Sequence, residues 1–114
     1  TPPPPAPGAL VEANDPALSR PRCVACPAPQ LPLIAEQPAY RSELVKSGGY
    51  VELRVLVDEN GRVVQATALK GDKALSDAAV KAVRLWKYTP GTKQDVKVKV
   101  WIVVPIQFVL PPLR

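Results

Sequence analysis

The sequence predicts an α+β fold: a three-stranded antiparallel sheet with two helices on one face, in the order α-β-β-α-β, preceded by a proline-rich extended segment. Three observations support this prediction. Residues 96–108 alternate between apolar and other positions, and residues 50–58 do the same before an Asn60-Gly61 turn. Apolar residues recur at helical spacing over 75–86.

The first third of the chain is dominated by proline. Ten of the 15 prolines precede Gln37, and no periodic apolar pattern marks a helix or strand there. We predict that residues 1–36 form a linker, mostly disordered or in polyproline II geometry, with a reach of roughly 110 Å at about 3.1 Å per residue. A tail with no spacer function is the alternative. The folded domain is expected to span residues 37–110, followed by a tail over 111–114.

Positive charge is concentrated in the expected domain. Residues 1–36 carry a net charge of −1, so the remaining residues account for +6 in a chain whose total is +5. The basic residues are spread through the expected elements as a solvated face would be. Only Trp101 offers a base-stacking ring on that face, and we therefore predict no nucleic acid partner.

Cys23 and Cys26 are the two cysteines, in the motif C-V-A-C-P. A zinc site needs four ligands and the chain has no histidine, so we expect no metal. A thioredoxin-like redox centre would need this motif at the start of a helix, whereas here it lies among prolines. The pair is expected either to form a local disulfide or to remain as two free thiols.

A short helix is expected to open the domain. Pro38 occupies a first helical position, and Gly48-Gly49 ends the helix after Ser47. So short a helix is not stable alone and must be held by packing, with Tyr40 as its largest contributor.

A β-hairpin is expected next. Residues 50–58 place four apolar side chains on one face, and Asn60-Gly61 predicts a tight turn into a return strand over 62–69. The return strand has Ala66 and Ala68 where larger residues usually pack. A bulky side chain should therefore cover them.

A second helix is expected to supply that cover. Its apolar positions recur from Leu75 to Trp86, and either Asp72 or Ser76 should cap its start. Trp86 can then lie over the small residues of the return strand. We interpret Trp86 and Tyr88 as core residues rather than an aromatic binding site, because the domain has few other large apolar side chains to bury.

The long strand over 96–108 suggests the function. One face holds Val, Ile and Phe, and the other holds Lys97, Lys99 and Gln107. At about 3.3 Å per residue the strand would extend roughly 40 Å, so part of its backbone edge should lack an internal partner. The two lysines and Pro105 discourage unspecific pairing of this edge with other strands. The edge is still expected to accept a specific partner strand.

Catalytic constellations are missing from the sequence. It has no histidine, no nucleophile beside a base, no glycine-rich phosphate loop and no metal-ligand cluster. The acidic pairs Asp58 with Glu59 and Asp72 with Asp77 fall in a turn and at a helix start, where acids are expected for capping. We therefore predict a binding module, with no enzymatic activity and no cofactor.

Four motifs lie within the expected domain. They are Q-P-x-Y from residue 37, V-x-L-x-V-x-V-D-x-x-G-x-V from residue 51, L-S-D-A-A-x-x-A-V-R-x-W-x-Y-x-P from residue 75 and V-P-I-x-F from residue 104. In this combination they resemble the C-terminal domain of the TonB family. The resemblance covers residues 37 to 110, and the proline-rich stretch before them resembles the periplasmic spacer of that family.

The resemblance implies the periplasmic domain of an energy transducer, tethered to the inner membrane in the full-length protein and coupling the proton-motive force to nutrient uptake. Its partners would be TonB-dependent outer-membrane transporters, whose TonB box adds as a strand to the last strand of the domain. An ExbB/ExbD-like motor complex would be reached through an N-terminal anchor that this chain lacks. The implied partner-binding residues are Gln37, Pro38, Tyr40, Lys97, Val98, Lys99, Val100, Trp101, Ile102 and Val103.

Two other functions remain open on the same fold. The domain could be the interaction module of a membrane-bound sensor or of a secretion or motility protein, because a fold does not fix its partner. It could also be a dimerisation module, in which the free edge pairs with a second copy and exchanges strands.

Overall fold

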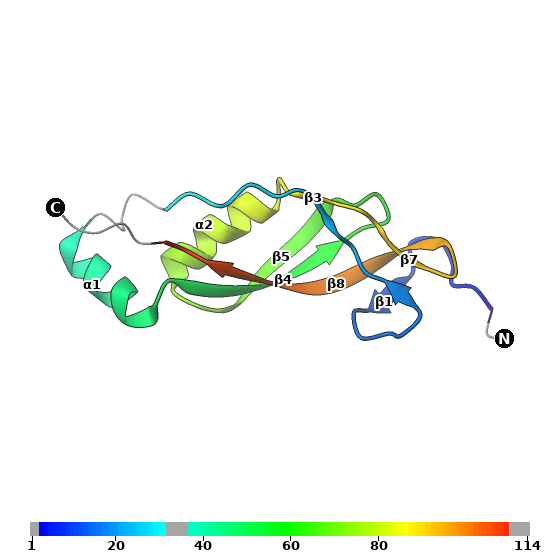
Figure 1. The fold of residues 1–114 in the computed structure, drawn as a ribbon, viewed down its shortest axis with the longest axis horizontal. Coiled ribbons are helices and arrows are strands. Elements are labelled where there is room, and N and C mark those ends of the chain that lie inside the picture. The colour runs from blue at the N-terminus through cyan, green and yellow to red at the C-terminus, as the bar shows by residue number, and fades with distance from the viewer. Residues whose placement is uncertain (1–2, 32–36, 110–114) are drawn as a thin grey trace.

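The computed structural model describes residues 3–31 and 37–109, which form an elongated domain of 61 × 21 × 17 Å (Figure 1). Helix α1 lies at one end of the long axis, and strands β1 and β7 lie at the other. In chain order the elements are β1 (Leu10–Glu12), β2 (Leu18–Ser19), β3 (Cys23–Ala25), α1 (Pro38–Ser47), β4 (Tyr50–Val57), β5 (Val63–Lys70), α2 (Lys73–Val83), β6 (Lys87–Tyr88), β7 (Gly91–Lys93) and β8 (Val96–Gln107).

The centre of the fold is an antiparallel sheet in which β4 lies between β5 and β8. The β4–β8 register runs from Val57 opposite Val100 to Tyr50 opposite Gln107. These three strands and the two helices follow the predicted order. The bounds of the three strands agree with the predicted ranges to within one residue, and α2 ends at Val83, before the predicted end at Trp86. The α+β class is therefore confirmed.

The main core lies between this sheet and α2. Alternate residues of β4 and β8 are buried, as their sequence periodicity predicts, and Leu44 of α1 joins the same core from the end of the domain. Trp86 is 8% exposed and packs there, with the small Ala66 of β5 at the margin. The fully and nearly buried members of the main core are Leu44, Val51, Leu53, Val55, Val57, Leu75, Ala79, Val83, Trp86, Val104, Ile106 and Phe108.

Both helices begin where their capping residues predict. Helix α1 has Gln37 in extended geometry at its N-cap and Pro38 in its first turn, and it ends at Gly48, which has a φ of 77°. The carboxylate of Asp72 caps α2 by accepting a hydrogen bond from the N–H of Ala74 at 2.9 Å. The start of α2 is therefore fixed by the Asp72 cap, and the start of α1, which has no side-chain cap, is favoured by the fixed φ of Pro38.

The β4–β5 turn needs glycine for two reasons. Gly61 has a φ of 79°, in the left-handed region, and a Cβ placed there would lie 1.9 Å from the carbonyl oxygen of Tyr88. The Asp58 carboxylate tightens the same turn by accepting hydrogen bonds from the N–H groups of Asn60 and Arg62. The hairpin predicted from Asn60-Gly61 is confirmed.

The prediction of a three-stranded sheet is wrong, because further strands join it. β7 forms a tight hairpin with β8, in which Gln94 and Asp95 have positive φ angles of 51° and 65°. Such turns usually contain Asn or Gly, so the Gln-Asp pair gives no recognisable hairpin signal. β6 pairs with β3 in a separate two-stranded sheet, and its two residues are too few for an alternating pattern to reveal it.

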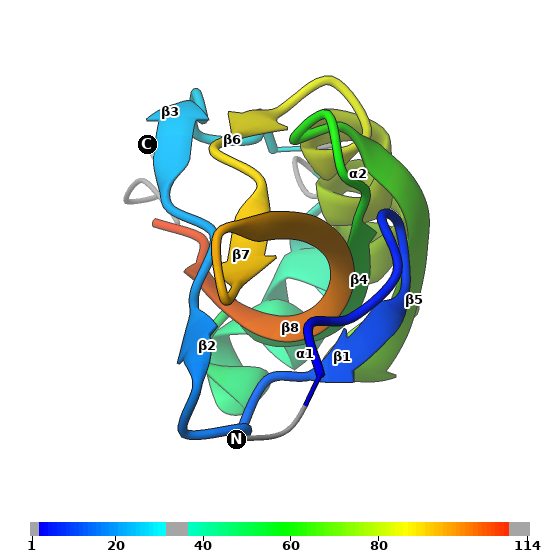
Figure 2. The same ribbon diagram turned by 90° about the vertical axis from the view of Figure 1, so that its right-hand side faces the viewer.

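The prediction of a linker over residues 1–36 is wrong where the structure forms strands. β1 pairs with β8 in parallel, β2 pairs with β7 and β3 pairs with β6, both antiparallel (Figure 2). These strands are short and lie between prolines, and partners from the other end of the chain fix their conformation. Residues 32–36 and the expected tail over 111–114 lie outside the described residues.

Candidate strand-addition site

Strand β8, which the sequence singled out, pairs with three other strands. In the order of their position along β8 these are β7 at residues 96–98, β1 at residues 99–101 and β4 at residues 100–107. Figure 2 shows that the first part of β8 curls at the end of the domain where β1, β2 and β7 gather around it.

β1 lies on the edge of β8 opposite β4 and β7. Lys97 has Thr92 of β7 as its register partner, while its carbonyl oxygen accepts a hydrogen bond from the N–H of Gly8. Trp101 has partners in both β4 and β1. Because a strand has two edges, residues 97–101 are flanked on both sides by the chain's own segments.

Backbone hydrogen bonds hold the segment around β1 on this edge. The N–H of Gly8 donates to the carbonyl of Lys97 at 2.9 Å, and the N–H of Lys99 donates to the carbonyl of Ala9 at 2.8 Å. The register continues with Leu10–Glu12 opposite the three residues from Lys99 onward. The backbone groups of β8 that would pair with an added strand therefore already pair with one, β1.

A small apolar cluster lies beneath β1. Val11 is 7% exposed and packs with Val98 and Val100, in a cluster distinct from the main core. Leu10, its neighbour, points the other way and is 62% exposed. A single well-buried side chain of β1 thus anchors this strand to the sheet.

The chain continues from β1 around the β7–β8 hairpin. Leu18 of β2 lies opposite Lys93 of β7, and the ammonium of Lys93 is 2.7 Å from the Asp15 carboxylate. That hydrogen bond, together with one from the N–H of Ala17, holds the pKa of Asp15 below its ordinary value. We call residues 8–19 the clasp, because they grip the hairpin on the outer edges of both its strands.

Past β1, the edge of β8 is open among the described residues. From Ile102 to Gln107 the strand pairs with β4 alone. Val103 is 58% exposed there, and Pro105 has no N–H to offer a visiting strand. The predicted receiving edge, Lys97–Val103, is therefore divided: its first five residues carry the clasp, and its last two begin the open stretch.

The side chains of the predicted edge alternate between two environments. Val98 and Val100 are buried, whereas Lys97 is exposed and Lys99 is half-buried. Trp101 is half-buried beneath the guanidinium of Arg54, which lies 4.2 Å from the ring centroid. This cation–π contact places another positive charge beside the edge, where a partner with acidic residues would be favoured.

The other predicted contact residues lie far from this edge. Gln37 and Pro38 are exposed at the start of α1, at the opposite end of the domain from β1 (Figure 1). Tyr40 lies within α1, and its side chain is outside the described residues. The amide of Gln107 donates a hydrogen bond to the carbonyl of Gly48, so α1 adjoins the far end of β8. The open stretch of β8 lies between the two groups.

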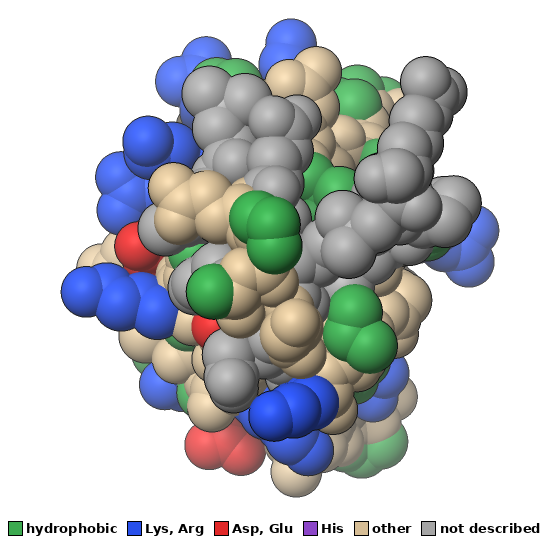
Figure 3. All heavy atoms as spheres, turned by 90° about the vertical axis from the view of Figure 1, so that its left-hand side faces the viewer, with side chains coloured by type: hydrophobic (Ala, Val, Ile, Leu, Met, Phe, Trp, Pro, Cys, Tyr) green, Lys and Arg blue, Asp and Glu red, His purple; other side chains and the backbone are tan. Residues whose placement is uncertain are grey.

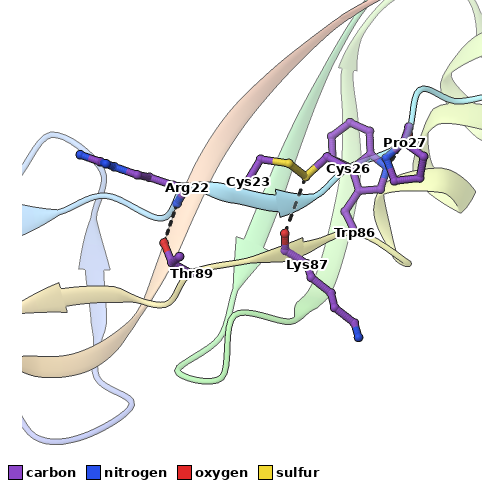
Figure 4. Close-up of a disulfide and its surroundings, with 7 residues drawn as sticks. All are labelled: Arg22, Cys23, Cys26, Pro27, Trp86, Lys87 and Thr89. Atoms are coloured by element: carbon purple, nitrogen blue, oxygen red, sulfur yellow. Dashed lines mark hydrogen bonds between the residues drawn. A yellow bond between two sulfur atoms is a disulfide. The ribbon is translucent and has the colours of Figure 1, made fainter.

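Cys23 and Cys26 are joined by a disulfide with a Cα–Cα distance of 6.1 Å (Figure 4). The Cys26 sulfur lies 3.7 Å from the carbonyl oxygen of Lys87, and the indole N–H of Trp86 donates to the carbonyl of Pro27 at 2.9 Å. The disulfide therefore belongs to a segment held against β6 and the main core, and not to the clasp.

The described residues offer neither a metal site nor a membrane-spanning helix. Viewed from the end that carries α1, Lys and Arg side chains are spread around the rim and do not gather into one patch (Figure 3). No group of acidic or cysteine side chains in residues 3–31 and 37–109 is arranged to hold a metal ion. In the same residues, no helix has the length and apolar character needed to cross a lipid bilayer.

The clasp is the part of the site that sequence reasoning missed. Its signals were the apolar pair Leu10-Val11, which follows Gly8, and the lone Leu18. Runs this short carry no periodicity, and proline-rich surroundings favour an extended linker on composition alone.

Comparison with known proteins places the domain. Residues 37–110 match the family model described as Gram-negative bacterial TonB protein C-terminal. The chain is 31% identical over 84 residues to the protein tonB2 of Pseudomonas aeruginosa, an alignment that covers 74% of this chain and 29% of that protein, so the chain spans less than a third of this relative. The solution structure of the Pseudomonas aeruginosa TonB C-terminal domain shares the fold, with a TM-score of 0.57 at 14% identity over 91% of this chain and 97% of that one. The match to the family model covers well over half of the sequence, and the chain belongs to the TonB C-terminal family.

Proposed function

We propose that this domain is the periplasmic, partner-binding part of a TonB-type energy transducer. It binds an extended segment of an outer-membrane transporter, the TonB box, by β-strand addition along β8. The observation that carries the proposal is the state of the outer edge of β8: residues 97–101 hold an extended strand, and residues 102–107 have none among the described residues.

Backbone pairing suits this task. A ladder of about four to six hydrogen bonds, each contributing roughly 0.5 to 1.5 kcal/mol net, gives modest affinity after the entropy cost of association. Modest affinity allows repeated capture and release. Since most of the ladder is backbone, the edge tolerates different segment sequences, while Lys97, Lys99 and Arg54 favour those that carry acidic residues.

The remaining contacts would come from the other end of the domain. Gln37 and Pro38 are exposed at the start of α1, at the end of the domain toward which the open stretch of β8 runs, so a transporter whose segment follows the strand can reach them. Tyr40 follows in the same helix. We assign these three residues to contacts with the transporter body.

Energy transduction also needs a membrane anchor and a motor complex. We propose that a preceding segment anchors the full-length protein in the inner membrane and engages an ExbB/ExbD-like motor complex. The prolines ahead of the clasp would then belong to the spacer. The disulfide between Cys23 and Cys26 is consistent with an oxidising compartment such as the periplasm. The domain has a binding role in this scheme and no catalytic one.

The test is an NMR titration of the domain with synthetic peptides from the amino-terminal segments of outer-membrane transporters of the same bacterium. We expect the largest backbone amide shifts from Lys97 to Val103, extending toward Gln107, with further changes near Gln37. A scrambled peptide of the same composition is the control. Shifts confined to the exposed lysines between Lys70 and Lys87 would contradict strand addition and favour electrostatic binding of another partner.

A second candidate function is dimerisation through a strand edge. β5 has β4 as its one partner among the described strands, and Val64 and Leu69 on it are 50% and 53% exposed. Such an edge can pair with a second copy. Mass measurement by sedimentation over a concentration series separates the two: a monomer at all concentrations favours the peptide-binding role, and a dimer favours this alternative. A sensor or secretion protein with this domain would also bind peptides, but from a different partner.

A further inference from the structure

We propose that the clasp, residues 8–19, is an intramolecular competitor that occupies the receiving edge of β8 and must detach before a partner strand can pair with Lys97–Trp101. The inference rests on the proposed function, because it assigns a regulator to the same edge. The partner competing with the clasp is an extended peptide segment.

The clasp and a visiting strand need the same backbone atoms of β8. The carbonyl of Lys97 accepts from Gly8, and the N–H of Lys99 donates to the carbonyl of Ala9. On the other side of β8, β7 pairs as far as Val98 and β4 pairs from Val100 onward. A visiting strand has no second edge there to use, so its binding to this part of β8 and the docking of the clasp exclude each other.

The clasp can leave β8 without unfolding the domain. The clasp packs on the separate cluster of Val98 and Val100 through the buried Val11 and the partly buried Ala13 and Leu18, and the main core draws no residue from the clasp. β1 has three residues, and Leu10 on it is 62% exposed. Detachment therefore uncovers a small apolar surface, which an incoming strand with an apolar residue in register would cover again.

Docking of the clasp buries a carboxylate oxygen unfavourably. Gly8 lies over the Glu59 carboxylate, so that a Cβ on Gly8 would be 3.4 Å from Oε2. This oxygen is buried and accepts no hydrogen bond from the described residues. Burying a carboxylate oxygen without a donor is unfavourable, and detachment of the clasp lets water reach it.

The clasp therefore lowers the apparent affinity for a partner strand, because the partner can pair with this edge only while the clasp is detached. A tethered segment competes at a high effective concentration, so a weak strand can still block the edge most of the time. Partner affinity is then reduced in proportion to the open fraction. A partner that is presented at high local concentration, or with a better strand, displaces the clasp, and low-affinity segments are rejected.

The experiment compares two variants of the full chain, Val11→Asp and Leu10→Asp. Both add one carboxylate to β1, but only the first places it at the buried position. The probe is a synthetic peptide with the sequence of residues 8–14, G-A-L-V-E-A-N, titrated to millimolar concentration and followed by amide shifts of Lys97–Trp101. Amide exchange at Lys99 reports whether the clasp is docked, and exchange at Phe108, whose N–H donates to Gly49, reports that the domain is folded.

We expect Val11→Asp to bind the peptide about tenfold more tightly than the wild type, with faster exchange at Lys99 and unchanged exchange at Phe108. Leu10→Asp should stay within about twofold of the wild type. Equal affinity of the wild type and Val11→Asp would overturn the inference, as would failure of the peptide to bind a Val11→Asp domain in which Lys99 exchanges fast. If this peptide behaves as expected while transporter peptides fail to bind either protein, the competition stands and the proposed function falls.

Discussion

The two halves of β8 share one alternating sequence pattern and have opposite structural roles. The second half, Ile102–Gln107, pairs with β4 and sends its buried side chains into the main core. The first half, Val96–Trp101, belongs to a separate cluster and is flanked on its outer edge by the clasp. The difference teaches that alternating burial along a strand does not tell which neighbouring segment belongs to the main core. In the second half that neighbour is β4, and in the first half a separate cluster holds the clasp.

Truncating a buried side chain in the main core and one in the clasp should give the largest difference in the free energy of unfolding. Leu53→Ala empties a fully buried position of β4 and should lower the free energy of unfolding by about 2 to 5 kcal/mol. Val11→Ala should lower it by about 1 kcal/mol, because the loss cannot exceed the docking free energy of the clasp. Urea denaturation followed by far-UV circular dichroism measures both. Similar losses for the two variants would mean that the clasp is part of the cooperative core.

Removing the disulfide tests whether the segment after the clasp belongs to the main core or to the clasp. Replacing both cysteines by serine, Cys23→Ser with Cys26→Ser, should lower the free energy of unfolding by about 2 kcal/mol, the loop entropy expected for so short a bridge. Because Cys26 packs at the margin of the main core, amide exchange at Lys99 should not change. Fast exchange at Lys99 with unaltered global stability would instead assign the disulfide to the clasp.

A proline in the first half of β8 separates backbone from side-chain recognition. In a Val11→Asp background, where the clasp no longer competes for the same N–H, Lys99→Pro removes a donor that points to the outer edge, and transporter peptides should bind about tenfold more weakly. Lys99→Ala removes only a charge and should weaken binding about twofold. Isothermal titration measures both, and circular dichroism checks that the proline variant is folded. Equal weakening by the two substitutions would contradict backbone pairing.

The smallest expected effect is the pH dependence of the clasp. The ammonium of Lys93 lowers the pKa of Asp15, so the ion pair stabilises the folded state above the ordinary pKa of an aspartate, about 4, and is lost as the pH falls through the lowered value. The amide shift of Ala17, whose N–H donates to Asp15, should therefore titrate below pH 4. Asp15→Asn should abolish this titration and slightly speed exchange at Lys99. A midpoint at or above pH 4 would argue against the ion pair in solution.

Local signals in the sequence account for most of the domain. The cap at Asp72, the proline and glycines around α1 and the Asn60-Gly61 turn each fix an element boundary through chemistry confined to a few residues. The period-two pattern of β8 also gave the buried face correctly. These features depend on neighbours within one turn or one strand, which a sequence displays directly.

The clasp and the β7–β8 hairpin could not be predicted for the opposite reason. β1 is a strand only because β8 lies beside it, and Val11 is buried only by residues near the other end of the chain. The hairpin turn at Gln94-Asp95 has positive φ angles without glycine or asparagine, so tertiary pairing imposes a conformation that the residues themselves do not favour. Sequence reasoning thus singled out the edge of β8 as the proposed receiving edge and missed the segment that covers part of it.

Native-state amide exchange measured residue by residue at increasing urea concentration tests the difference between the halves of β8 most directly. The amide of Lys99, bonded to Ala9, should exchange through a local opening with little dependence on urea, whereas that of Val104, inside the β4–β8 ladder, should exchange only through global unfolding. The same urea dependence and the same opening free energy at both amides would contradict the account, because the clasp would then leave only when the whole domain unfolds.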